Sequence, residues 1–347
     1  MQPENPEVGA NDTGIALPKP EEMPSCLPKT MRAVAYDRYG CADVLRLTET
    51  RTPLPKPGEL ILRVVAAGVN PIDYRLRRGD ARYILPGGFP RIPGYDVAGT
   101  VLFAPSTCGV MPGDRVMAFL GDKYGGGYAS YARCSANGVS KIPDSLSFEQ
   151  AAAIPLAAST ALQSLRDHGK IRSGTQVLIN GASGGVGAFA VQIAKAYGAE
   201  VTAVSSAANE SFVRSIGADH FIDYKQSTFT DSNQIWDLVF DVAGKSSYSK
   251  SRNVLSRGGR YVSTEPSVSG AIMSIATKLL SKKGTIMLAR PCREDLRELV
   301  ELIEAGKMSV TIDRLFPLQQ AADAHRRIET GVDRGKIVIQ VGQEPAP

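Results

Sequence analysis

A glycine-rich turn carries the clearest chemistry in the sequence. Residues Val177 to Gly187 read as a short apolar strand that runs into a turn, and a helical pattern follows over Ala188 to Tyr197. From Ala182 the turn has the spacing A-x-G-x-x-G, in which Gly184 lets the backbone approach a diphosphate and Gly187 lets the helix pack closely on the strand. Backbone amides and the helix dipole then bind the negative charge. The turn predicts a dinucleotide site; the alternative is a tight turn that holds no ligand.

The same turn fits a second chemistry. The segment Gly181 to Gly185 also reads G-x-S-x-G, the nucleophile elbow of α/β-hydrolases, and it too lies between a strand and a helix. A catalytic triad would need an acid and then a histidine after Ser183, and Asp241 and His325 occur in that order. However, no HGGG-like oxyanion segment precedes the turn, and the charged neighbours of His325 indicate a surface histidine. A serine hydrolase is therefore the less favoured alternative.

The residues after the next two strands bear on the choice of dinucleotide. An NAD site normally has Asp or Glu at the end of its second strand, whereas here that strand ends in Ser205 and Ser206. Hydroxyls, the amide of Asn209 and a nearby cation can instead hydrogen-bond a 2′-phosphate. Tyr224 and Lys225, directly after the third strand, supply an aromatic wall and that cation, or they only edge the sheet. We predict NADPH in preference to NADH.

Three upstream motifs carry a family resemblance: Asn70-Pro71-Ile72-Asp73, Ile92-Pro93-Gly94-Tyr95-Asp96 and Pro112-Gly113-Asp114-Arg115-Val116. They resemble the medium-chain dehydrogenase/reductase superfamily, and residues 180–195 resemble the signature of its quinone oxidoreductase and zeta-crystallin branch. Thr175 departs from that signature, which usually has a polar, often charged residue there. The resemblance covers Met31 to Val341. It implies an α/β fold with a GroES-like β-barrel catalytic domain, a doubly wound parallel-sheet Rossmann domain and a cofactor cleft between them.

The resemblance also concerns zinc. The zinc alcohol dehydrogenases of this superfamily have a cysteine at the position of Asn70 and a His-Glu pair at the positions of Tyr95 and Asp96, so both main ligand positions have changed. Zn²⁺ needs three or four S, N or O donors that converge on one point. The chain has three histidines, no paired cysteines and only Cys108 and Cys134 in the region of the relatives' structural zinc lobe. We predict no metal.

The predicted acceptor follows from this chemistry. Without a Lewis acid, reduction of a simple ketone is poorly supported, because a developing alkoxide needs strong electrostatic stabilisation. A quinone or the β-carbon of an α,β-unsaturated carbonyl spreads the incoming charge and demands less. The sequence therefore predicts a zinc-independent oxidoreductase that transfers hydride from NADPH to such an acceptor. The contrasting alternative is a non-catalytic NADPH-binding or interaction protein of the same fold.

The resemblance implies roles for individual residues. Asn70 resembles an asparagine near the nicotinamide ribose, or it only opens a turn; Asp73 orients the loop or pairs with Arg77. Tyr95 donates a hydrogen bond to a carbonyl, stacks on a quinone, or is a core tyrosine. The predicted catalytic residues are Asn70, Asp73 and Tyr95. The predicted cofactor-binding residues are Asn70, Thr160, Ser183, Gly184, Gly185, Val186, Ser205, Ser206, Asn209, Tyr224, Lys225 and Val242.

The resemblance also bears on Thr160 and Arg75. Thr160 resembles the family threonine on the nicotinamide side, and the alternative is a helix hydroxyl bonded to its own backbone. Arg75 stands where relatives commonly have a tyrosine, which leaves the substrate preference open.

The pattern of predicted secondary structure changes near residue 153. Before it, short strands are separated by glycine and proline, which is typical of a β-rich module. After it, apolar runs alternate with helical segments, which suits a parallel sheet covered on both faces. The predicted strands are Arg32–Tyr36, Leu60–Ala66, Val97–Phe103, Arg115–Phe119, Tyr128–Cys134, Gln176–Asn180, Glu200–Ser205, His220–Asp223, Asp237–Asp241, Arg260–Ser263, Thr285–Ala289, Val310–Ile312 and Lys336–Val341. Helices are predicted over Glu294–Ala305 and Gln319–Glu329.

These patterns divide the chain as follows. We predict a disordered tail over residues 1–30, which hold six prolines and no aromatic residue. The catalytic domain covers 31–152 and returns over 292–342, the Rossmann domain covers 153–291, and 343–347 form a second tail. Because Thr285 to Ala289 would be an edge strand with unpaired backbone groups, we predict a homodimer through that edge.

Composition limits the remaining possibilities. The 347 residues are 43% hydrophobic and 22% charged, which excludes a fibre, a disulfide scaffold and a wholly disordered chain. The net charge of +5 is spread along the sequence, so an anionic small ligand is favoured over nucleic acid. No apolar stretch reaches the length of a membrane span. Five separated cysteines indicate a reducing compartment, and the N-terminal segment lacks the arginines of a transit peptide, so we predict a cytoplasmic protein.

Overall fold

The structure is a computed structural model that describes residues 27–343, apart from residues 84, 86, 122, 124, 267, 332 and 333. The predicted N-terminal tail lies outside the described residues except for residues 27–30, and Thr30 already belongs to the first strand. The end of the predicted C-terminal tail, residues 344–347, also lies outside them.

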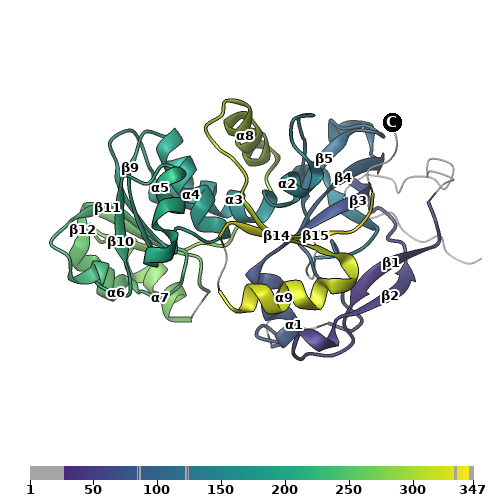
Figure 1. The fold of residues 1–347 in the computed structure, drawn as a ribbon, viewed down its shortest axis with the longest axis horizontal. Helices are drawn as coiled ribbons and strands as arrows, with labels where there is room; N and C mark the ends of the chain where they lie inside the picture. The colour runs from purple at the N-terminus through teal and green to yellow at the C-terminus, as the bar shows by residue number, and fades with distance from the viewer. Residues whose placement is uncertain are drawn as a thin grey trace, which may run out of the picture.

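One lobe is built on a mostly antiparallel sheet in the order β14-β15-β3-β4-β5-β7, with β6 paired to β3 and a separate hairpin-like pair of β1 and β2 (Figure 1). The strands are β1 (Thr30–Ala35), β2 (Arg46–Arg51), β3 (Glu59–Val69), β4 (Asp96–Phe103), β5 (Arg115–Phe119), β6 (Tyr131–Ser135), β7 (Val139–Lys141), β14 (Ile312–Pro317) and β15 (Lys336–Gln340). Because β15 pairs with β3, the end of the chain lies in the same sheet as its first third.

The other lobe holds a six-stranded parallel sheet in the order β10-β9-β8-β11-β12-β13. Its strands are β8 (Gln176–Asn180), β9 (Glu200–Ser205), β10 (His220–Asp223), β11 (Trp236–Asp241), β12 (Leu255–Ser263) and β13 (Lys283–Ile286). The strand order reverses between β8 and β11, and ligands of doubly wound sheets bind at the carboxyl ends of the strands at such a switch point. The predicted α/β fold class is confirmed.

Helices cover the parallel sheet and join the lobes (Figure 1). They are α1 (Pro71–Arg78), α2 (Phe148–Ala152), α3 (Pro155–Leu162), which continues as a π-helical turn over Gln163–Gly169, α4 (Gly185–Ala196), α5 (Glu210–Ser215), α6 (Tyr248–Ser251), α7 (Val268–Ala276), α8 (Arg293–Glu304) and α9 (Ala321–Glu329).

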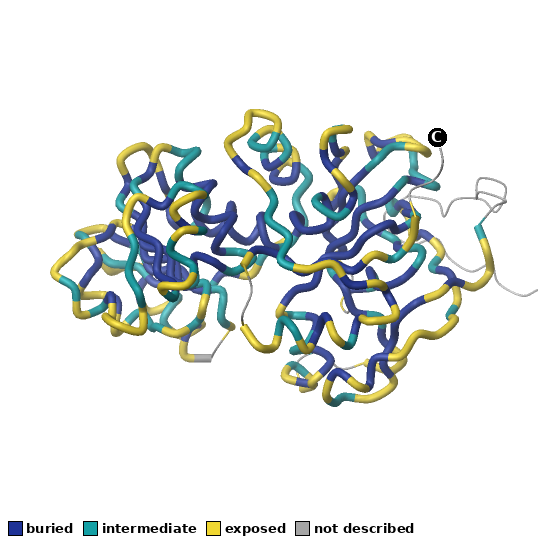
Figure 2. Tube along the Cα trace, in the orientation of Figure 1, coloured by how far each residue is buried: buried dark blue, intermediate teal, exposed yellow. Residues whose placement is uncertain are grey.

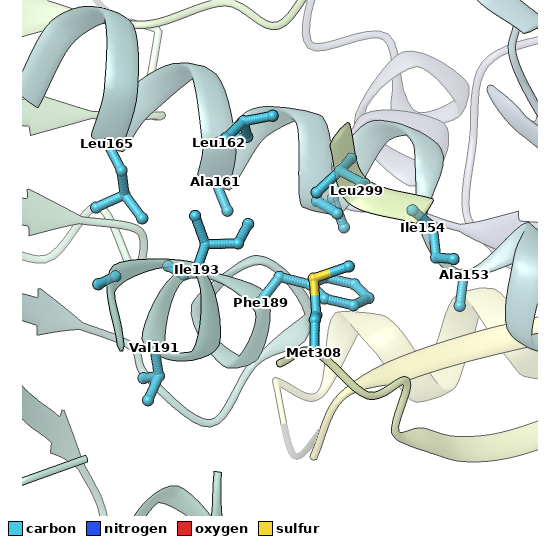
Figure 3. Packing of buried hydrophobic residues seen from close by; sticks show 14 of the residues in the cluster. Ala153, Ile154, Ala161, Leu162, Leu165, Phe189, Val191, Ile193, Leu299 and Met308 are labelled. Carbon is cyan, nitrogen blue, oxygen red and sulfur yellow. The ribbon is translucent and has the colours of Figure 1, made fainter. Parts of the chain in front are cut away.

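Burial explains why these elements form. The strands of both sheets are the buried centres of the two lobes, while the outer faces of the helices are exposed (Figure 2). Between the lobes, α3 packs on α4 through apolar side chains that include Leu162, Phe189 and Ile193, and Leu299 of α8 joins the same cluster (Figure 3). This continuous core fixes the start of α4, and with it the glycine-rich turn.

The sequence-based boundaries were wrong in several places. The strands β2 and β7 were not predicted, the strand predicted at Tyr128–Cys134 begins at Tyr131, and that predicted at Val310–Ile312 is β14, which runs over Ile312–Pro317. The edge strand predicted at Thr285–Ala289 is β13, and it ends at Ile286. Edge and surface strands carry a weaker apolar pattern than buried ones, which explains most of these shifts.

Candidate active site

The glycine-rich turn follows β8 and leads into α4. A Cβ added at Gly187 would lie 2.1 Å from the carbonyl oxygen of Gly181, so only glycine lets helix and strand approach this closely. A Cβ added at Gly184 would meet only that same oxygen, at 3.7 Å, so the outer side of the turn is open. Gly184 is also the N-cap of α4 and provides no side-chain cap for the first amides of the helix. The turn therefore fits the diphosphate of a dinucleotide.

Three of the predicted ribose-end residues lie together beside this turn. The hydroxyl of Ser205 donates to Ser183 Oγ at 2.9 Å, and Asn209 Nδ2 donates to Ser183 Oγ at 3.0 Å and to Ser205 Oγ at 3.3 Å. Ser206 begins the next 3-10 turn, Ala207–Asn209. The amide nitrogen of Tyr224 donates to the carbonyl oxygen of Ser205 at 3.2 Å, so Tyr224 also lies at the end of β9.

The predicted aromatic wall and cation face an open hollow. Tyr224 is 57% exposed, and it lines with Lys225 a hollow of about 810 Å³ formed by the segment after β10. The backbone amide of Lys225 donates to Asp223 Oδ1 at 3.0 Å. Val242 lies at the switch point, where its amide donates to the carbonyl oxygen of Asn180 at 3.0 Å.

One cation at the ribose end was missed by the sequence analysis. Arg334 Nε donates to Asn209 Oδ1 at 2.6 Å, and Arg334 Nη2 donates to the carbonyl oxygen of Ala208 at 2.5 Å. Arg334 comes from the segment before β15 and reaches across to the parallel-sheet lobe. Nothing in its local sequence indicated this position, because the contact depends on how the end of the chain returns to the barrel.

Asp73 acts on the backbone around it. It is buried on α1, where its carboxylate accepts hydrogen bonds from the amides of Asn70, at 2.8 Å, and Gly94, at 3.0 Å. The phenol of Tyr128 donates to it at 3.4 Å. Burial raises the pKa of Asp73 to about 7, with the two backbone donors opposing the shift and the Asp96 carboxylate adding to it. The expected alternative partner, Arg77, instead pairs with Glu329.

A second buried polar cluster, formed by Asn70, Asp96 and Lys336, lies beside Asp73. Asn70 Nδ2 donates to Asp96 Oδ2 at 2.8 Å, and Lys336 Nζ donates to Asn70 Oδ1 at 2.5 Å and to the carbonyl oxygen of Val69 at 3.0 Å. Lys336 Nζ also lies 3.7 Å from Asp96 Oδ2. The other oxygen of Asp96 accepts from the amide of Leu156 at 2.7 Å. Burial raises the pKa of Asp96, while Lys336 and Asn70 oppose that rise.

Lys336 was also missed, although one signal was available. It is a charged residue that opens the otherwise apolar strand Ile337-Val338-Ile339, and a charge in that position needs a buried partner.

Two predicted residues have hydroxyls that are already engaged. The phenol of Tyr95, which is half-buried, donates to the carbonyl oxygen of Lys123 at 2.7 Å. The hydroxyl of Thr160 is buried and donates to the carbonyl oxygen of Leu156, one turn earlier in α3, at 2.7 Å. Each oxygen keeps lone pairs that accept hydrogen bonds, whereas donation to a ligand would require the present bond to break.

The three residues of the alternative hydrolase triad do not come together. Ser183 Oγ accepts from Ser205 and Asn209, and Asp241 accepts from Asn180 Nδ2 at 2.8 Å. His325 is fully buried, with Nε2 3.2 Å from the phenol oxygen of Tyr128, so the expectation of a surface histidine was wrong. Its helix packs against α1, and the charged neighbours Asp323 and Arg326 are exposed. Within the described part of the chain, no hydrogen bond joins Ser183 to Asp241 or His325.

The donor set at the positions of the zinc ligands is unsuited to a metal ion. Asn70 and Asp96 are tied to the ammonium of Lys336, a positive charge that would repel a divalent cation. Over the described ranges no group of three or more His, Cys, Asp or Glu residues converges on one point. The four described cysteines, Cys41, Cys108, Cys134 and Cys292, are not joined in disulfides.

An ion pair joins the two lobes. Arg75 Nη2, on α1, donates to Glu265 Oε2, after β12, at 2.8 Å. A Cβ added at Gly244, after β11, would lie 3.0 Å from the Cβ of Glu265, so the pair lies close to the carboxyl end of β11.

Comparisons with known proteins agree with this geometry. The family described as "Alcohol dehydrogenase GroES-like domain" matches residues 56–144, and that described as "Zinc-binding dehydrogenase" matches residues 216–339. A chloroplastic quinone-oxidoreductase homolog of Spinacia oleracea is 38% identical over 326 residues, which cover 90% of this chain and 99% of the relative. The 2-methylene-furan-3-one reductase of Solanum lycopersicum is 34% identical over 90% of this chain and 80% of its own. The solved structure of a quinone oxidoreductase from Coxiella burnetii matches with a TM-score of 0.83 and 33% identity, over 90% of this chain and 100% of that one.

Proposed function

Since this chain belongs to the quinone oxidoreductase branch of the medium-chain dehydrogenase/reductase superfamily and is an NAD(P)H oxidoreductase, we propose that it transfers hydride from NADPH to a quinone or an α,β-unsaturated carbonyl compound. The proposed reaction uses no metal. The observation that carries the proposal is the open glycine-rich turn, which is flanked by hydroxyl and amide groups at one end and by the Asn70 cluster at the other.

The ribose end supports NADPH over NADH. Ser183, Ser205 and Asn209 offer hydroxyl and amide groups where an NAD site has a carboxylate, and Arg334 adds a guanidinium beside them. A guanidinium binds phosphate in two-point geometry and stays charged at any working pH. The test is the Kd of the full chain for NADPH and for NADH; equal affinity, or tighter NADH, would contradict this part of the proposal.

In the proposed reaction, residues of the glycine-rich turn bind the cofactor and residues of the barrel lobe contact the acceptor. A reduced nicotinamide cofactor bound in the cleft supplies the hydride. The amides at the start of α4 hold its diphosphate, and Asn70 presents a side-chain amide to the acceptor. The engaged phenol of Tyr95 offers its ring face, which suits a quinone. Holding the two reactants in contact lowers the barrier by several kcal/mol, roughly 7 or more in favourable cases.

The names of the relatives support the acceptor class. The Solanum relative is a reductase of a methylene-furanone, an activated alkene, and the Spinacia and Coxiella proteins carry the name of quinone oxidoreductases. The deciding assay is loss of absorbance at 340 nm when NADPH is mixed with a panel of quinones and enones. NADPH binding without oxidation by any of them would favour the non-catalytic alternative.

The metal-free part of the proposal has its own test. Dialysis against a chelator, followed by metal analysis, should leave turnover unchanged and find less than one zinc ion per ten chains. One tightly held zinc per chain would contradict it.

We also propose that the chain forms a homodimer through β13. This strand is the last of the parallel sheet, and apolar residues near it are exposed, among them Ile275 at 70%, Leu279 at 99% and Leu288 at 72%. An edge strand with exposed apolar neighbours is a liability that pairing with a second copy removes. Light scattering after gel filtration should give about twice the mass of 37.0 kDa. A monomer across the micromolar range would contradict the dimer.

The compartment remains a prediction. None of the helices in the described parts of the chain is both long and apolar enough to cross a bilayer. We propose the cytoplasm, on the separated cysteines and the composition of the N-terminal segment, and fractionation of cells that express the tagged full chain tests it.

A further inference from the structure

Lys336 is a buried charge with a fixed set of partners. Its side chain is 4% exposed, and its ammonium donates to the carbonyl oxygen of Val69 and to Asn70 Oδ1, with Asp96 Oδ2 at 3.7 Å. Burying an ammonium is costly unless it is paired and hydrogen-bonded, and here both conditions are met.

The stem and the ammonium of Lys336 point to different parts of the site. A Cβ added at Gly185 would lie 2.8 Å from Lys336 Cδ, so the stem packs against the glycine-rich turn. The amide of Gly335 also donates to the carbonyl oxygen of Ser183 at 3.0 Å. The ammonium, however, points to Asn70, on the barrel side. Lys336 thus touches the diphosphate turn with its stem but directs its charge at the amide of Asn70.

This arrangement fixes the orientation of the Asn70 amide. A cation on Oδ1 and a carboxylate on Nδ2 allow only one of the two amide orientations, since the flipped amide would point its N–H groups at the ammonium and its oxygen at the carboxylate. The ammonium also draws electron density toward Oδ1, and hydrogen bonds in such a chain strengthen one another. The second N–H of Asn70, the one not bound to Asp96, therefore becomes a stronger donor.

We propose that Lys336 is a positioning residue that orients and polarises the Asn70 amide toward the acceptor oxygen. The inference rests on the proposed function. Lys336 forms no bond to the substrate and transfers no proton. Its charge acts through Asn70 on the negative charge that reaches the acceptor oxygen as the hydride is transferred. The ammonium thus acts through the amide of Asn70 rather than by direct contact with the acceptor.

The main test is a double-mutant cycle in the full chain. Lys336→Met keeps the length of the stem and removes the charge. We expect it to lower kcat about 100-fold, the loss typical of one removed oxyanion donor, while the Kd for NADPH changes less than about threefold. Asn70→Ala should cause a similar loss of kcat. Adding Lys336→Met to Asn70→Ala should then cost less than about threefold more, because the two residues act in series. Independent losses, unchanged kcat, or a loss confined to NADPH affinity would overturn the proposal.

A second variant keeps the test valid if Lys336→Met fails to fold. Lys336→Met leaves Asp96 as an unpaired buried charge, so Lys336→Met combined with Asp96→Asn keeps the cluster neutral. This double variant should melt close to the wild type and still show the large loss of kcat; full kcat would overturn the proposal. Lys141→Met, which removes a lysine paired with Asp114 on the surface, is the matched control.

A spectroscopic readout separates this inference from the proposed reaction. In protein labelled with ¹⁵N asparagine, the side-chain amide of Asn70 is assigned by its loss in Asn70→Ala. Its hydrogens should exchange slowly in the wild type and faster in the neutral double variant, while those of the exposed Asn233 stay unchanged. Fast exchange of Asn70 in the wild type would refute the fixed amide. Lack of turnover with every quinone and enone would instead refute the proposed function alone.

Discussion

Asp73 illustrates, at the scale of single residues, how side chains of this site work through the backbone. Its carboxylate is buried and accepts from the amides of Asn70 and Gly94, which come from two separate segments. It therefore holds the turn that carries Asn70 against the turn that carries Tyr95. We expect Asp73 to position these neighbours rather than to contact the substrate.

Arg334 gives the first prediction. Arg334→Gln should raise the KM for NADPH about tenfold and leave that for NADH within about twofold, because an exposed charge-assisted hydrogen bond to the proposed 2′-phosphate would contribute on the order of 1.5 kcal/mol. Steady-state kinetics with both cofactors measure the difference. Arg326→Gln, which removes an exposed arginine of α9 paired with Asp323, is the control. Equal effects on both cofactors would show that Arg334 does not recognise the phosphate.

His325 gives a prediction about pH. Burial, with help from the nearby Arg77, lowers the pKa of His325 to about 3, well below its ordinary 6.5. Between these values the unfolded chain binds a proton that the folded chain does not, so stability is lost as the pH falls from about 6.5 toward 3. From pH 7 to 5 this costs about 2 kcal/mol. His325→Gln should remove that part of the slope in urea unfolding at pH 7, 6 and 5, and an unchanged slope would contradict the low pKa.

At the scale of elements, we expect opposite effects from alanine substitution at two glycines of the turn, Gly184 and Gly187. Gly187→Ala places a Cβ 2.1 Å from the oxygen of Gly181, so α4 must move from β8, and we expect a loss of about 2 kcal/mol or more in the free energy of unfolding. Gly184 has an ordinary φ of −73° and open space, so Gly184→Ala should keep the stability. Its methyl group would stand where we propose that the diphosphate binds, and it should raise the Kd for NADPH about tenfold or more.

Thermal melting and cofactor titration of both variants decide between these roles. The two substitutions are chemically identical and three residues apart, so each is the control for the other. If Gly184→Ala lost stability but bound NADPH normally, the open side of the turn would not be the diphosphate site.

Several strands were predicted with the same bounds that the structure gives them. The bounds of β5, β8, β9 and β10 match the prediction. Parallel strands covered on both faces read as continuous apolar runs, which explains the match of β8 and β9, whereas β10 is an edge strand that is only partly buried. In contrast, β2 is almost wholly exposed, and β7 has three residues, so neither carries a readable pattern.

In the candidate site, residues with a local sequence signal were predicted, and residues placed by distant strand pairing were missed. Ser183, Ser205 and Asn209 were predicted together, since motif spacing places them at neighbouring strand ends. Arg334 and Lys336 were missed because they reach the site only through the pairing of β15 with β3, a contact between the two ends of the chain. The local sequence around Arg334 carries no signal for that pairing, whereas the charge of Lys336 at the start of an apolar strand indicated a buried partner.

At the scale of the whole molecule, two contacts join the lobes beside the proposed cofactor site. Arg334 reaches Asn209 near the ribose end, and Arg75 pairs with Glu265 on the barrel side. Both arginines come from the barrel lobe, and both bind acceptors on the parallel-sheet lobe. We therefore expect the loss of either contact to change how the lobes meet at the proposed cofactor site. We expect a smaller effect on the stability of each lobe.

The last prediction concerns the Arg75–Glu265 pair. Its side chains are 33% and 44% exposed, so it should add less than about 1 kcal/mol to folding, and Glu265→Gln should melt close to the wild type. Because the pair joins the two lobes beside the proposed cofactor site, its loss should speed NADPH dissociation about threefold at low salt, measured by stopped-flow fluorescence. Since salt screens exposed charges, this difference should vanish near 0.5 M NaCl. Glu210→Gln, which breaks a similarly exposed pair with Arg214 within one lobe, should leave dissociation unchanged. If both variants released NADPH at the wild-type rate, the pair would not control the cleft.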